Sequence, residues 1–230
     1  MIFGKIDYLN LLPFYVFLKK NLRISTQKQI LTHKKNSPSK INRDYRMRRI
    51  DAAFISSIRA KHEKCSNLGI VAKEEVLSVF VIPGIVKKDE ASETSNALAD
   101  ILDLQGEVII GDKALQQYYA GTNAVDLAQR WHELYHLPFV FALLCFHNHD
   151  QLIKELSKKF IRAQVKIPYP IMQKYSKSRS LSPDQINHYL STIFQKYVQN
   201  PTPSSQLSSP SRHSFDSIVS IRNDKLFLYP

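Results

Sequence analysis

The amino-acid sequence predicts an α/β protein of two lobes with a ligand cleft between them. Three observations lead to this fold class. Short apolar segments alternate with helical patterns before residue 83 and again after residue 139. The stretch between them is rich in acidic residues and carries its own helices and strand. Two strongly apolar segments, Val76–Ile82 and Phe139–Phe146, flank that stretch. We therefore expect lobe 2 at residues 83–139 to be inserted into lobe 1, which comprises 1–82 and 140–230.

The first lobe reads as strands followed by helices. Its expected elements are a strand over 2–6, a helix from Leu12 with Pro13 in its first turn, a strand over 29–32, a helix from Pro38 to about Arg48 with Ser37 as N-cap, and strands over 50–55, 68–72 and 76–82. A further helix begins where Ser56-Ser57 ends the strand over 50–55. This alternation predicts a mainly parallel sheet covered by helices on both faces.

Further helices and strands are expected after residue 94. We expect a helix over 95–102, a strand over 107–110, a helix from Asp112, a helix over 124–135, a buried strand over 139–146, and helices over 148–165, after Pro168, and over 184–199 with Ser182 as cap and Pro183 at its first position. Residues 200–214 are rich in Pro and Ser and predict a flexible linker. The tail over 215–229 is apolar enough to dock as a helix or a strand. If the two apolar strands lie side by side as crossings between the lobes, a ligand sits in the cleft at strand ends and helix N-termini.

Composition places the chain among globular proteins, with 43% hydrophobic and 10% aromatic residues. The longest apolar run, Leu137 to Phe146, falls far short of the ~20 residues of a membrane-spanning helix. The N-terminal residues Met1 to Asp7 lack the pattern of a signal peptide. We therefore expect a soluble, cytoplasmic protein without a membrane partner. Cys65 and Cys145, which lack metal or redox spacing, are expected to be reduced.

The net charge of +12 is concentrated in one basic stretch over residues 19–49, where Asp44 is the single acid. Such a stretch could bind nucleic acid, draw an anionic substrate toward the protein, or form a solvated face. No recognised nucleic-acid motif accompanies it, so we favour the solvated face and do not expect nucleic acid as a partner.

His132-Glu133-Leu134-Tyr135-His136 matches H-E-x-x-H, the helix of zinc metallopeptidases. The two histidines would share one helix face, with Glu133 as general base. Leu137-Pro138 ends the helix directly after His136, so an ordinary helix end, where histidine suits the dipole, explains the pattern as well. We favour that interpretation and predict no metal.

Mostly neutral polar residues at or near predicted strand ends and helix starts, with one glycine and one acid, are the candidates for a binding cleft: Asn10, Ser56, Ser57, Ser78, Thr94, Ser95, Gly111 and Asp112. Hydroxyls and free N–H groups at a helix start can hold a carboxylate, although ordinary helix capping accounts equally for Thr94, Ser95 and Asp112. Asn10 and Ser78 stand among apolar residues and need partners if buried. There is no nucleotide-binding loop and no nucleophile with a nearby base. These residues alone do not distinguish an enzyme from a solute-binding protein.

Several segments in one order carry a resemblance to a known family. They are Gly4 to Pro13, Ile50 to Ser57, Val76 to Val79, Thr94-Ser95, Gly111 to Leu115, Trp131, and Leu137 to Ala142. Together they resemble the chorismate dehydratases, the first enzymes of the futalosine route to menaquinone. The similarity runs from about Gly4 to Leu143, with helical agreement to about Val198. It implies the type II periplasmic-binding-protein fold, a hydro-lyase activity and no cofactor.

The resemblance implies that chorismate loses water and becomes 3-[(1-carboxyvinyl)oxy]benzoate, with proton removal assisted by a carboxylate of the substrate. Asn10 would orient that carboxylate or the leaving hydroxyl, while Ser56, Ser78, Thr94 and Ser95 would hold the carboxylates. The sequence departs from some relatives in lacking a basic residue after Thr94-Ser95, in a short second lobe and in the Pro/Ser linker. Alternatives that remain are a non-catalytic cytoplasmic solute-binding protein, a zinc metallopeptidase, and a relative acting on cyclic dehypoxanthinyl futalosine.

Overall fold

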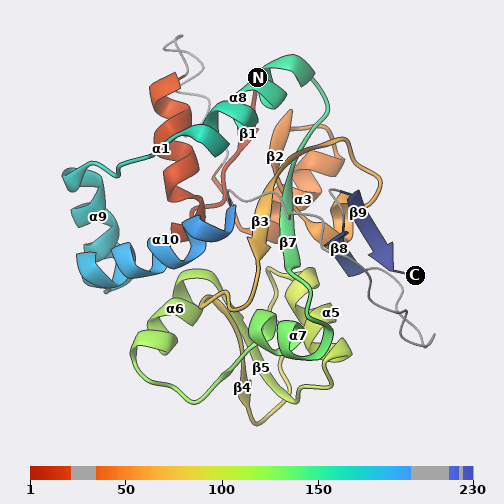
Figure 1. Cartoon of the computed structure of the whole chain (residues 1–230), viewed down its shortest axis with the longest axis vertical. Helices are drawn as coiled ribbons and strands as arrows, with labels where there is room; N and C mark the ends of the chain where they lie inside the picture. Colours follow the sequence, from red (N-terminus) through yellow and green to blue (C-terminus); the bar gives the residue numbers. More distant parts are fainter. Residues whose placement is uncertain (22–34, 198–217, 223–224, 230) are drawn as a thin grey trace.

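The computed structural model describes residues 1–21, 35–197, 218–222 and 225–229 (Figure 1). The strand expected over 29–32 and the linker expected over 200–214 lie outside these residues. Figure 1 shows a first sheet in the upper part of the molecule and a second sheet, with its own helices, in the lower part. Within the described part of the chain, no helix has both the length and the apolar character needed to cross a membrane.

The first sheet has the strand order β1-β2-β7-β3, with β1 (Phe3–Gly4), β2 (Ala52–Ser56), β7 (Phe139–Phe146) and β3 (Cys65–Ala72). Only β1 and β2 are parallel in this sheet; β7 runs antiparallel to both of its neighbours. The prediction of a mainly parallel sheet is therefore wrong. The chain leaves the sheet at the end of β3 and returns from below as β7, so the returning strand must run opposite to the strands between which it inserts.

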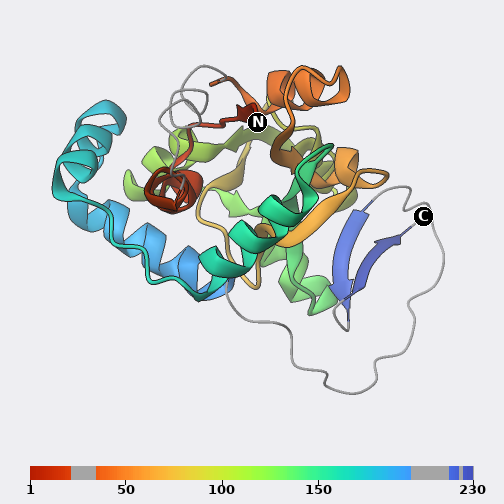
Figure 2. The same ribbon diagram turned by 90° about the horizontal axis from the view of Figure 1, so that it is seen from above.

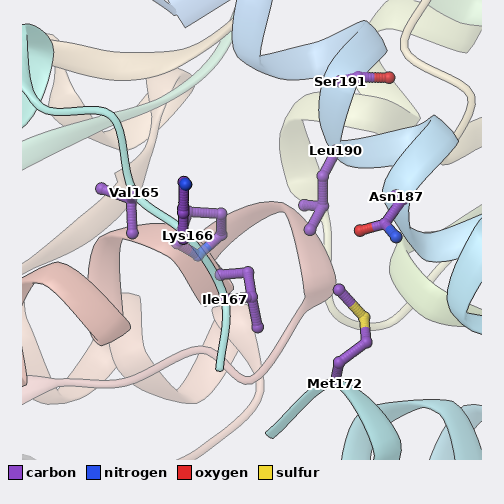
Figure 3. A pocket seen from close by; sticks show the side chains of 8 residues that line it. Val165, Lys166, Ile167, Met172, Asn187, Leu190 and Ser191 are labelled. Atoms are coloured by element: carbon purple, nitrogen blue, oxygen red, sulfur yellow. The ribbon is translucent and has the colours of Figure 1, made fainter. Parts of the chain in front are cut away.

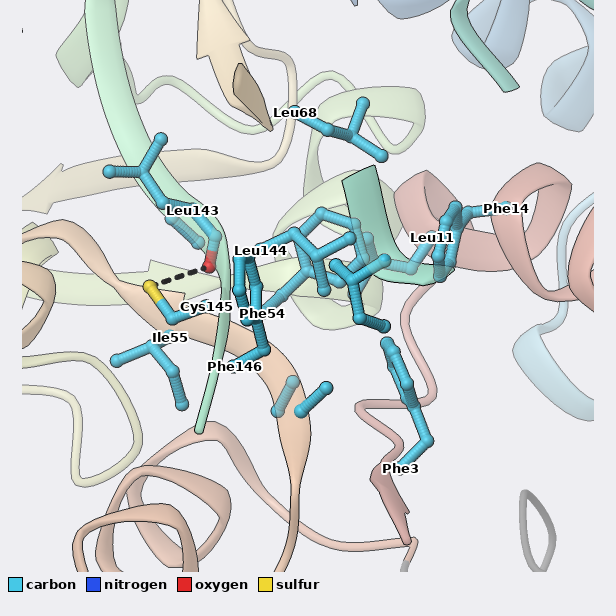
Figure 4. Packing of buried hydrophobic residues seen from close by; sticks show 14 of the residues in the cluster. Phe3, Leu11, Phe14, Phe54, Ile55, Leu68, Leu143, Leu144, Cys145 and Phe146 are labelled. Carbon is cyan, nitrogen blue, oxygen red and sulfur yellow. Dashed lines mark hydrogen bonds between the residues drawn. The ribbon is translucent and has the colours of Figure 1, made fainter. Parts of the chain in front are cut away.

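The largest core cluster covers this sheet (Figure 4). Every residue of β7 is buried, as its continuous apolar run predicted. The helices around it are α1 (Leu12–Asn21), α3 (Pro38–Arg46), α4 (Ser57–Ala60) and α8 (Asp150–Arg162). Pro13 lies in the first turn of α1 and Ser37 at the N-cap of α3, both as predicted. Phe14 of α1 contacts Phe54 of β2 and Phe160 of α8 edge-on, at centroid distances of 5.1 and 5.2 Å.

The second sheet has the order β5-β4-β6, with β4 (Val79–Pro83), β5 (Gly106–Ile110) and β6 (Val125–Asp126), and is antiparallel. Its helices are α5 (Glu93–Ile101), α6 (Gly111–Tyr119) and α7 (Leu127–Tyr135). These strands and helices enclose a second apolar cluster around Leu98, Leu127 and Trp131. The same cluster includes Ala72 of β3 and Phe139 and Phe141 of β7, so it continues from the second sheet to the first.

The two strongly apolar strands do not lie side by side, because β4 pairs with β5 and β6 while β7 pairs with β2 and β3. The partner of β7 where the chain crosses is β3, with Ala72 opposite Phe139. The expected lobe boundary at residue 83 would separate β4 from its own sheet. We propose instead that the second lobe begins after Ala72 and ends before Phe139.

A buried carboxylate binds the segment between β3 and β4, where the chain passes from the first sheet to the second. Asp126, 6% exposed, accepts the backbone N–H groups of Val76 and Leu77 through Oδ2. Its Oδ1 accepts those of Ala128 and Gln129 at the start of α7. One side chain therefore satisfies four donors and joins the crossing to the second lobe.

Two further helices, α9 (Tyr169–Arg179) and α10 (Pro183–Tyr197), follow α8. Ser182 and Gln185 form a capping box: the Gln185 N–H donates to Ser182 Oγ at 3.1 Å and the Ser182 N–H to Gln185 Oε1 at 2.8 Å. Figures 1 and 2 show this pair along one side of the molecule, with α10 above α6 in Figure 1. A third apolar cluster joins the pair to both lobes through Leu9, Leu12, Leu77, Leu115, Met172, Tyr175, Leu181, Ile186, Tyr189 and Leu190.

The prediction that both cysteines are reduced is wrong. Cys65 of β3 and Cys145 of β7 face each other in the strand register and form a disulfide. A separation of 80 residues hid this neighbourhood from the sequence. In Figure 4, Cys145 Sγ lies 3.5 Å from the carbonyl oxygen of Leu143.

Near the C-terminus, β8 (Ile218–Arg222) and β9 (Lys225–Tyr229) form an antiparallel pair. The tail thus adopts the strand that was one of its two expected forms.

Candidate active site

The turn after β1 carries the first candidate residue. Leu9–Leu11 form a short 3-10 helix, η1, which leads directly into α1. Leu9 and Leu11 are buried and anchor the turn, while Asn10 between them is half-buried. Its side chain is therefore partly accessible as a whole, while its Oδ1 atom is buried.

The start of α6 closes onto this turn from the second lobe. The backbone N–H of Leu9 donates to Asp112 Oδ1 at 2.9 Å. Gly111 adopts φ 66°, and a Cβ there would come within 2.7 Å of the Tyr8 ring. Glycine is thus required both for the backbone conformation and for the close approach of Tyr8. Burial, together with the charges of Asp89 and Asp112, raises the pKa of the Tyr8 hydroxyl well above its usual range, so the phenol stays neutral.

A cationic residue that sequence reasoning missed lies beside the same turn. Arg179, the last residue of α9, donates through Nε to Asp112 Oδ2 at 2.8 Å. Its NH2 group donates to Asp7 at two atoms, the carbonyl oxygen at 2.8 Å and Oδ2 at 3.0 Å. A separation of 172 residues between Asp7 and Arg179 leaves no sequence signal for this contact.

The carboxylate of Asp7 has further partners. Tyr175 donates its hydroxyl to Asp7 Oδ1 at 2.6 Å, Lys35 Nζ lies 2.6 Å from Oδ2, and Lys5 Nζ lies 3.4 Å from Oδ1. Burial by itself would raise the pKa of Asp7, but the hydrogen bonds and positive charges outweigh it and hold the pKa well below its usual range. Burial raises the pKa of Asp112, and the Leu9 N–H and Arg179 offset part of that effect.

A cluster of hydroxyls forms a second contact between the lobes, at the N-terminus of α5. Ser57 Oγ and Thr94 Oγ1 lie 3.4 Å apart, and the Ile58 N–H donates to Thr94 Oγ1 at 3.5 Å. Ser57, Thr94 and Ser95 are at most 4% exposed. The N-cap is Ser92, whose Oγ accepts the Ser95 N–H at 3.2 Å and donates to Ser95 Oγ at 2.7 Å. The start of α5 is therefore capped by Ser92, and the hydroxyls of Ser57, Thr94 and Ser95 contact groups within the protein.

Ser56, the last residue of β2, is held by a residue that the sequence did not single out. Asn42 of α3 donates through Nδ2 to Ser56 Oγ at 2.7 Å, and its Oδ1 accepts the Ser56 N–H at 3.2 Å. Asn42 is a neutral residue in a basic helix, and its sequence context does not indicate a contact with Ser56.

The hydroxyl of Ser78 is occupied inside the protein. It donates to the Val76 carbonyl at 3.3 Å and accepts from the Tyr189 hydroxyl of α10 at 2.8 Å, and the residue is 2% exposed. Its carbonyl accepts the Gly111 N–H at 2.8 Å. Ser78 therefore sits behind Gly111 and supports the α6 start.

The candidates thus form two groups at the boundary of the lobes. Asn10, Ser78, Gly111 and Asp112 gather around η1, and Ser57, Thr94 and Ser95 gather at the α5 start. Ser56 lies next to the second group and binds α3. Arg179, Asp7 and Asn42 join these groups as residues revealed by the structure.

The H-E-x-x-H segment forms the end of α7. His136 is a left-handed cap with φ 54°, and its ring centroid lies 6.0 Å from that of His132. Glu133 is exposed and binds Arg130 and Gln129 on its own helix. Among the residues that the structure describes, no group of three His, Cys, Asp or Glu side chains could hold a metal ion.

A cavity of about 370 Å³ lies elsewhere, between the start of α1, the segment before α9, and α10 (Figure 3). Its lining is mostly apolar, with Lys166, Asn187 and Ser191 as polar members. None of the candidate residues lines it.

Comparisons with known proteins bear on both fold and family. A protein of Archaeoglobus fulgidus, AF1704, matches with a TM-score of 0.51 at 12% identity, over 86% of this chain and 88% of that one. The periplasmic aliphatic sulphonate binding protein SsuA from Escherichia coli is similar with a TM-score of 0.43 at 13% identity, over 84% of each chain. The similarity to AF1704 concerns the fold alone.

The sequence comparisons reach further. A family model described as menaquinone biosynthesis matches residues 1–105 and 92–199. The chorismate dehydratase of Campylobacter jejuni subsp. jejuni serotype O:23/36 (strain 81-176) is 47% identical over 197 residues, which cover 84% of this chain and 88% of that protein. The chain therefore belongs to the menaquinone biosynthesis family that includes this chorismate dehydratase.

Proposed function

We propose that the protein is a hydro-lyase that converts chorismate to 3-[(1-carboxyvinyl)oxy]benzoate and water. The observation that carries the proposal is the 47% identity to a chorismate dehydratase over most of both chains. The two groups of polar residues at the lobe boundary supply the chemistry that such a substrate needs.

The reaction removes a proton from the ring carbon that bears the enolpyruvyl ether and the hydroxyl from the neighbouring ring carbon. The electron pair of the broken C–H bond enters the ring, the C–O bond breaks, and the hydroxyl leaves as water with the proton that the ring carbon released. The ring becomes aromatic, which drives the reaction strongly. The protein therefore has mainly to position the substrate and place charge.

A base from the protein is not needed in this scheme. Chorismate has two carboxylates, and we infer that the one on its side chain takes the ring proton. Asn10, half-buried on η1, is our candidate for orienting that carboxylate or the departing hydroxyl. An amide suits this role because it offers two donors and an acceptor without a charge of its own.

The carboxylate-binding groups in this proposal are Ser56, Ser57, Thr94 and Ser95. They support it because three of them surround the N-terminus of α5, where backbone N–H groups and the helix dipole favour an anion. Gly111, Asp112 and Ser78 serve the same site from behind. The Ser78 carbonyl accepts the Gly111 N–H, Asp112 accepts the Leu9 N–H of η1, and the Ser78 hydroxyl binds Val76 and Tyr189.

The test is to incubate the purified protein with chorismate and follow ultraviolet absorbance and product mass. The proposal expects chorismate to disappear and a product lighter by one water to form. Binding without turnover would instead identify a solute-binding protein. Stoichiometric zinc by elemental analysis, with no effect on chorismate, would favour the metallopeptidase. A panel including cyclic dehypoxanthinyl futalosine separates the related activity.

A further inference from the structure

We propose that Arg179 is the positioning residue of the active-site turn, holding Asn10 in place by binding Asp7 before the turn and Asp112 across from it. This inference rests on the proposed function in one respect, since it takes Asn10 as the group that contacts the substrate. The claim that Arg179 holds the turn stands on geometry alone.

The guanidinium of Arg179 uses all three of its nitrogens. NH2 binds the carbonyl oxygen and Oδ2 of Asp7, Nε binds Asp112 Oδ2, and NH1 donates to Ser178 Oγ at 2.6 Å. The planar fork of an arginine can serve two carboxylates in fixed directions, whereas a lysine offers a single point charge.

Both carboxylates act on the same short stretch of backbone. Asp7 immediately precedes Tyr8, and Asp112 accepts the N–H of Leu9 at 2.9 Å. Arg179 therefore fixes the backbone on each side of Tyr8, at Asp7 and, through Asp112, at Leu9, the residue before Asn10. Loss of the guanidinium would remove one partner from Asp112 and one from Asp7, and with them the link from α9 to both sides of the turn.

The surroundings keep this contact rigid and largely shielded from water. The side chains of Arg179 and Asp7 are each 14% exposed, and that of Asp112 is 18% exposed. The guanidinium lies 4.2 Å from the ring centroid of Tyr175, which itself donates to Asp7. Gln116 of α6 binds the carbonyl oxygen of Arg179. Charge-assisted hydrogen bonds in such a site are stronger than exposed ion pairs.

A basic residue at the end of a helix also suits the helix dipole, so an ordinary C-terminal cation is the simpler alternative. That alternative would leave the guanidinium near the last carbonyls of α9. The structure instead directs NH2 onto Asp7, which precedes η1, and Nε onto Asp112 of α6, both far from Arg179 in the sequence.

The first test measures the turn itself by hydrogen exchange with mass spectrometry. Arg179→Gln should speed exchange in the peptide that covers residues 8–12, above all at Leu9. Arg130→Gln is the matched control, because Arg130 makes an exposed ion pair with Glu133 on α7. Unchanged protection of residues 8–12 in Arg179→Gln would overturn the inference.

The second test is kinetic, with chorismate as substrate. Arg179→Gln should lower kcat about tenfold or more and change KM by less than about threefold, since orientation of Asn10 matters most in the transition state. In an Asn10→Ala background, Arg179→Gln should not lower kcat further. A general structural effect would instead lower kcat in that background by the same factor as in the wild type. Arg179→Lys keeps the charge without the fork and should resemble Arg179→Gln; it also replaces Arg179→Gln if that variant does not fold.

The outcomes separate the two claims. A wild-type protein that leaves chorismate unchanged rejects the proposed function, and hydrogen exchange then still decides whether Arg179 holds the turn. An active wild type with full kcat in Arg179→Lys or Arg179→Gln rejects the role of Arg179 and leaves the proposed function in place.

Discussion

The side-chain amide of Asn42 binds Ser56 at two points, donating to its Oγ at 2.7 Å and accepting its backbone N–H at 3.2 Å. A backbone N–H can only donate, so the orientation of the amide is fixed. Ser56 Oγ must therefore accept from Nδ2, and its own hydrogen remains to be donated elsewhere. Asn42 thus leaves the Ser56 hydroxyl as a hydrogen-bond donor, as our proposal that Ser56 binds a carboxylate of the substrate requires.

We predict that Asn42→Asp raises KM for chorismate about tenfold or more and leaves kcat within about threefold of the wild type. The aspartate keeps the bond to the Ser56 N–H but takes the Ser56 hydroxyl hydrogen for itself, and a hydrogen bond to a charged group contributes about 1.5–3 kcal/mol. Steady-state kinetics measure both constants. The paired variant Ser56→Ala should show a similar KM, and adding Asn42→Asp to it should change KM much less. An unchanged KM in Asn42→Asp would contradict the donor role of Ser56.

The close approach of Gly111 to Tyr8 makes a second prediction, about stability. Gly111→Ala should lower the free energy of unfolding by about 2–4 kcal/mol, because it adds both a positive-φ strain and a clash with the Tyr8 ring. Gly121→Ala is the matched control: Gly121 has φ 74°, but nothing lies within 4 Å of its Cβ position. It should cost only about 1 kcal/mol. Chemical denaturation that gives equal losses for the two variants would show that Tyr8 is not in contact.

The lowered pKa of Asp7 predicts how the stability of the protein depends on pH. Its folded pKa lies below the unfolded value of about 3.9, so its contribution is fully present above that value and is lost as pH falls toward the folded pKa. We expect the wild type to exceed Asp7→Asn in stability at pH 7, and the difference to shrink as the pH is lowered from about 5 to about 3. Thermal denaturation at a series of pH values measures the difference. A gap that stays constant or widens in acid would contradict the ion pairs at Asp7.

We predict that Asn10→Ala loses catalytic activity but keeps the fold. Removing a group that stabilises developing charge in a transition state lowers kcat by about 10²–10³. Because Asn10 is half-buried while Leu9 and Leu11 provide the packing, the thermal transition should move by no more than a few degrees. Kinetics with circular dichroism test both parts, and full activity in the variant would remove Asn10 from the mechanism.

Most helices and strands were predictable because local signals dominate there. Ser37 with Pro38, Ser182 with Pro183, and the uniformly apolar β7 each mark an element without help from the rest of the chain. Strand direction was not predictable in the same way. The reversal of β7 depends on where an inserted lobe returns to the sheet, and the pairing of Cys65 with Cys145 depends on the same long-range register.

The candidate site also has one part that local sequence signals indicate and another that depends on long-range contacts. The polar residues at helix starts and strand ends are visible in the sequence, and the structure gathers Gly111 and Asp112 with η1, and Ser57 with Thr94. The residues that hold them are not visible. Arg179 and Asn42 are ordinary members of basic helices until the fold brings them against Asp7, Asp112 and Ser56. Ser78 was chosen for its hydroxyl, yet that hydroxyl is bound by Tyr189, which only the third apolar cluster brings near.

The most direct test of the central claim is to compare the wild type and Asn10→Ala with chorismate under the same conditions, with the product identified by mass spectrometry. The account predicts that the wild type forms a product lighter than chorismate by one water, with the absorbance of an aromatic ring, and that Asn10→Ala forms it at least about 100-fold more slowly. Chorismate recovered unchanged from the wild type would contradict it.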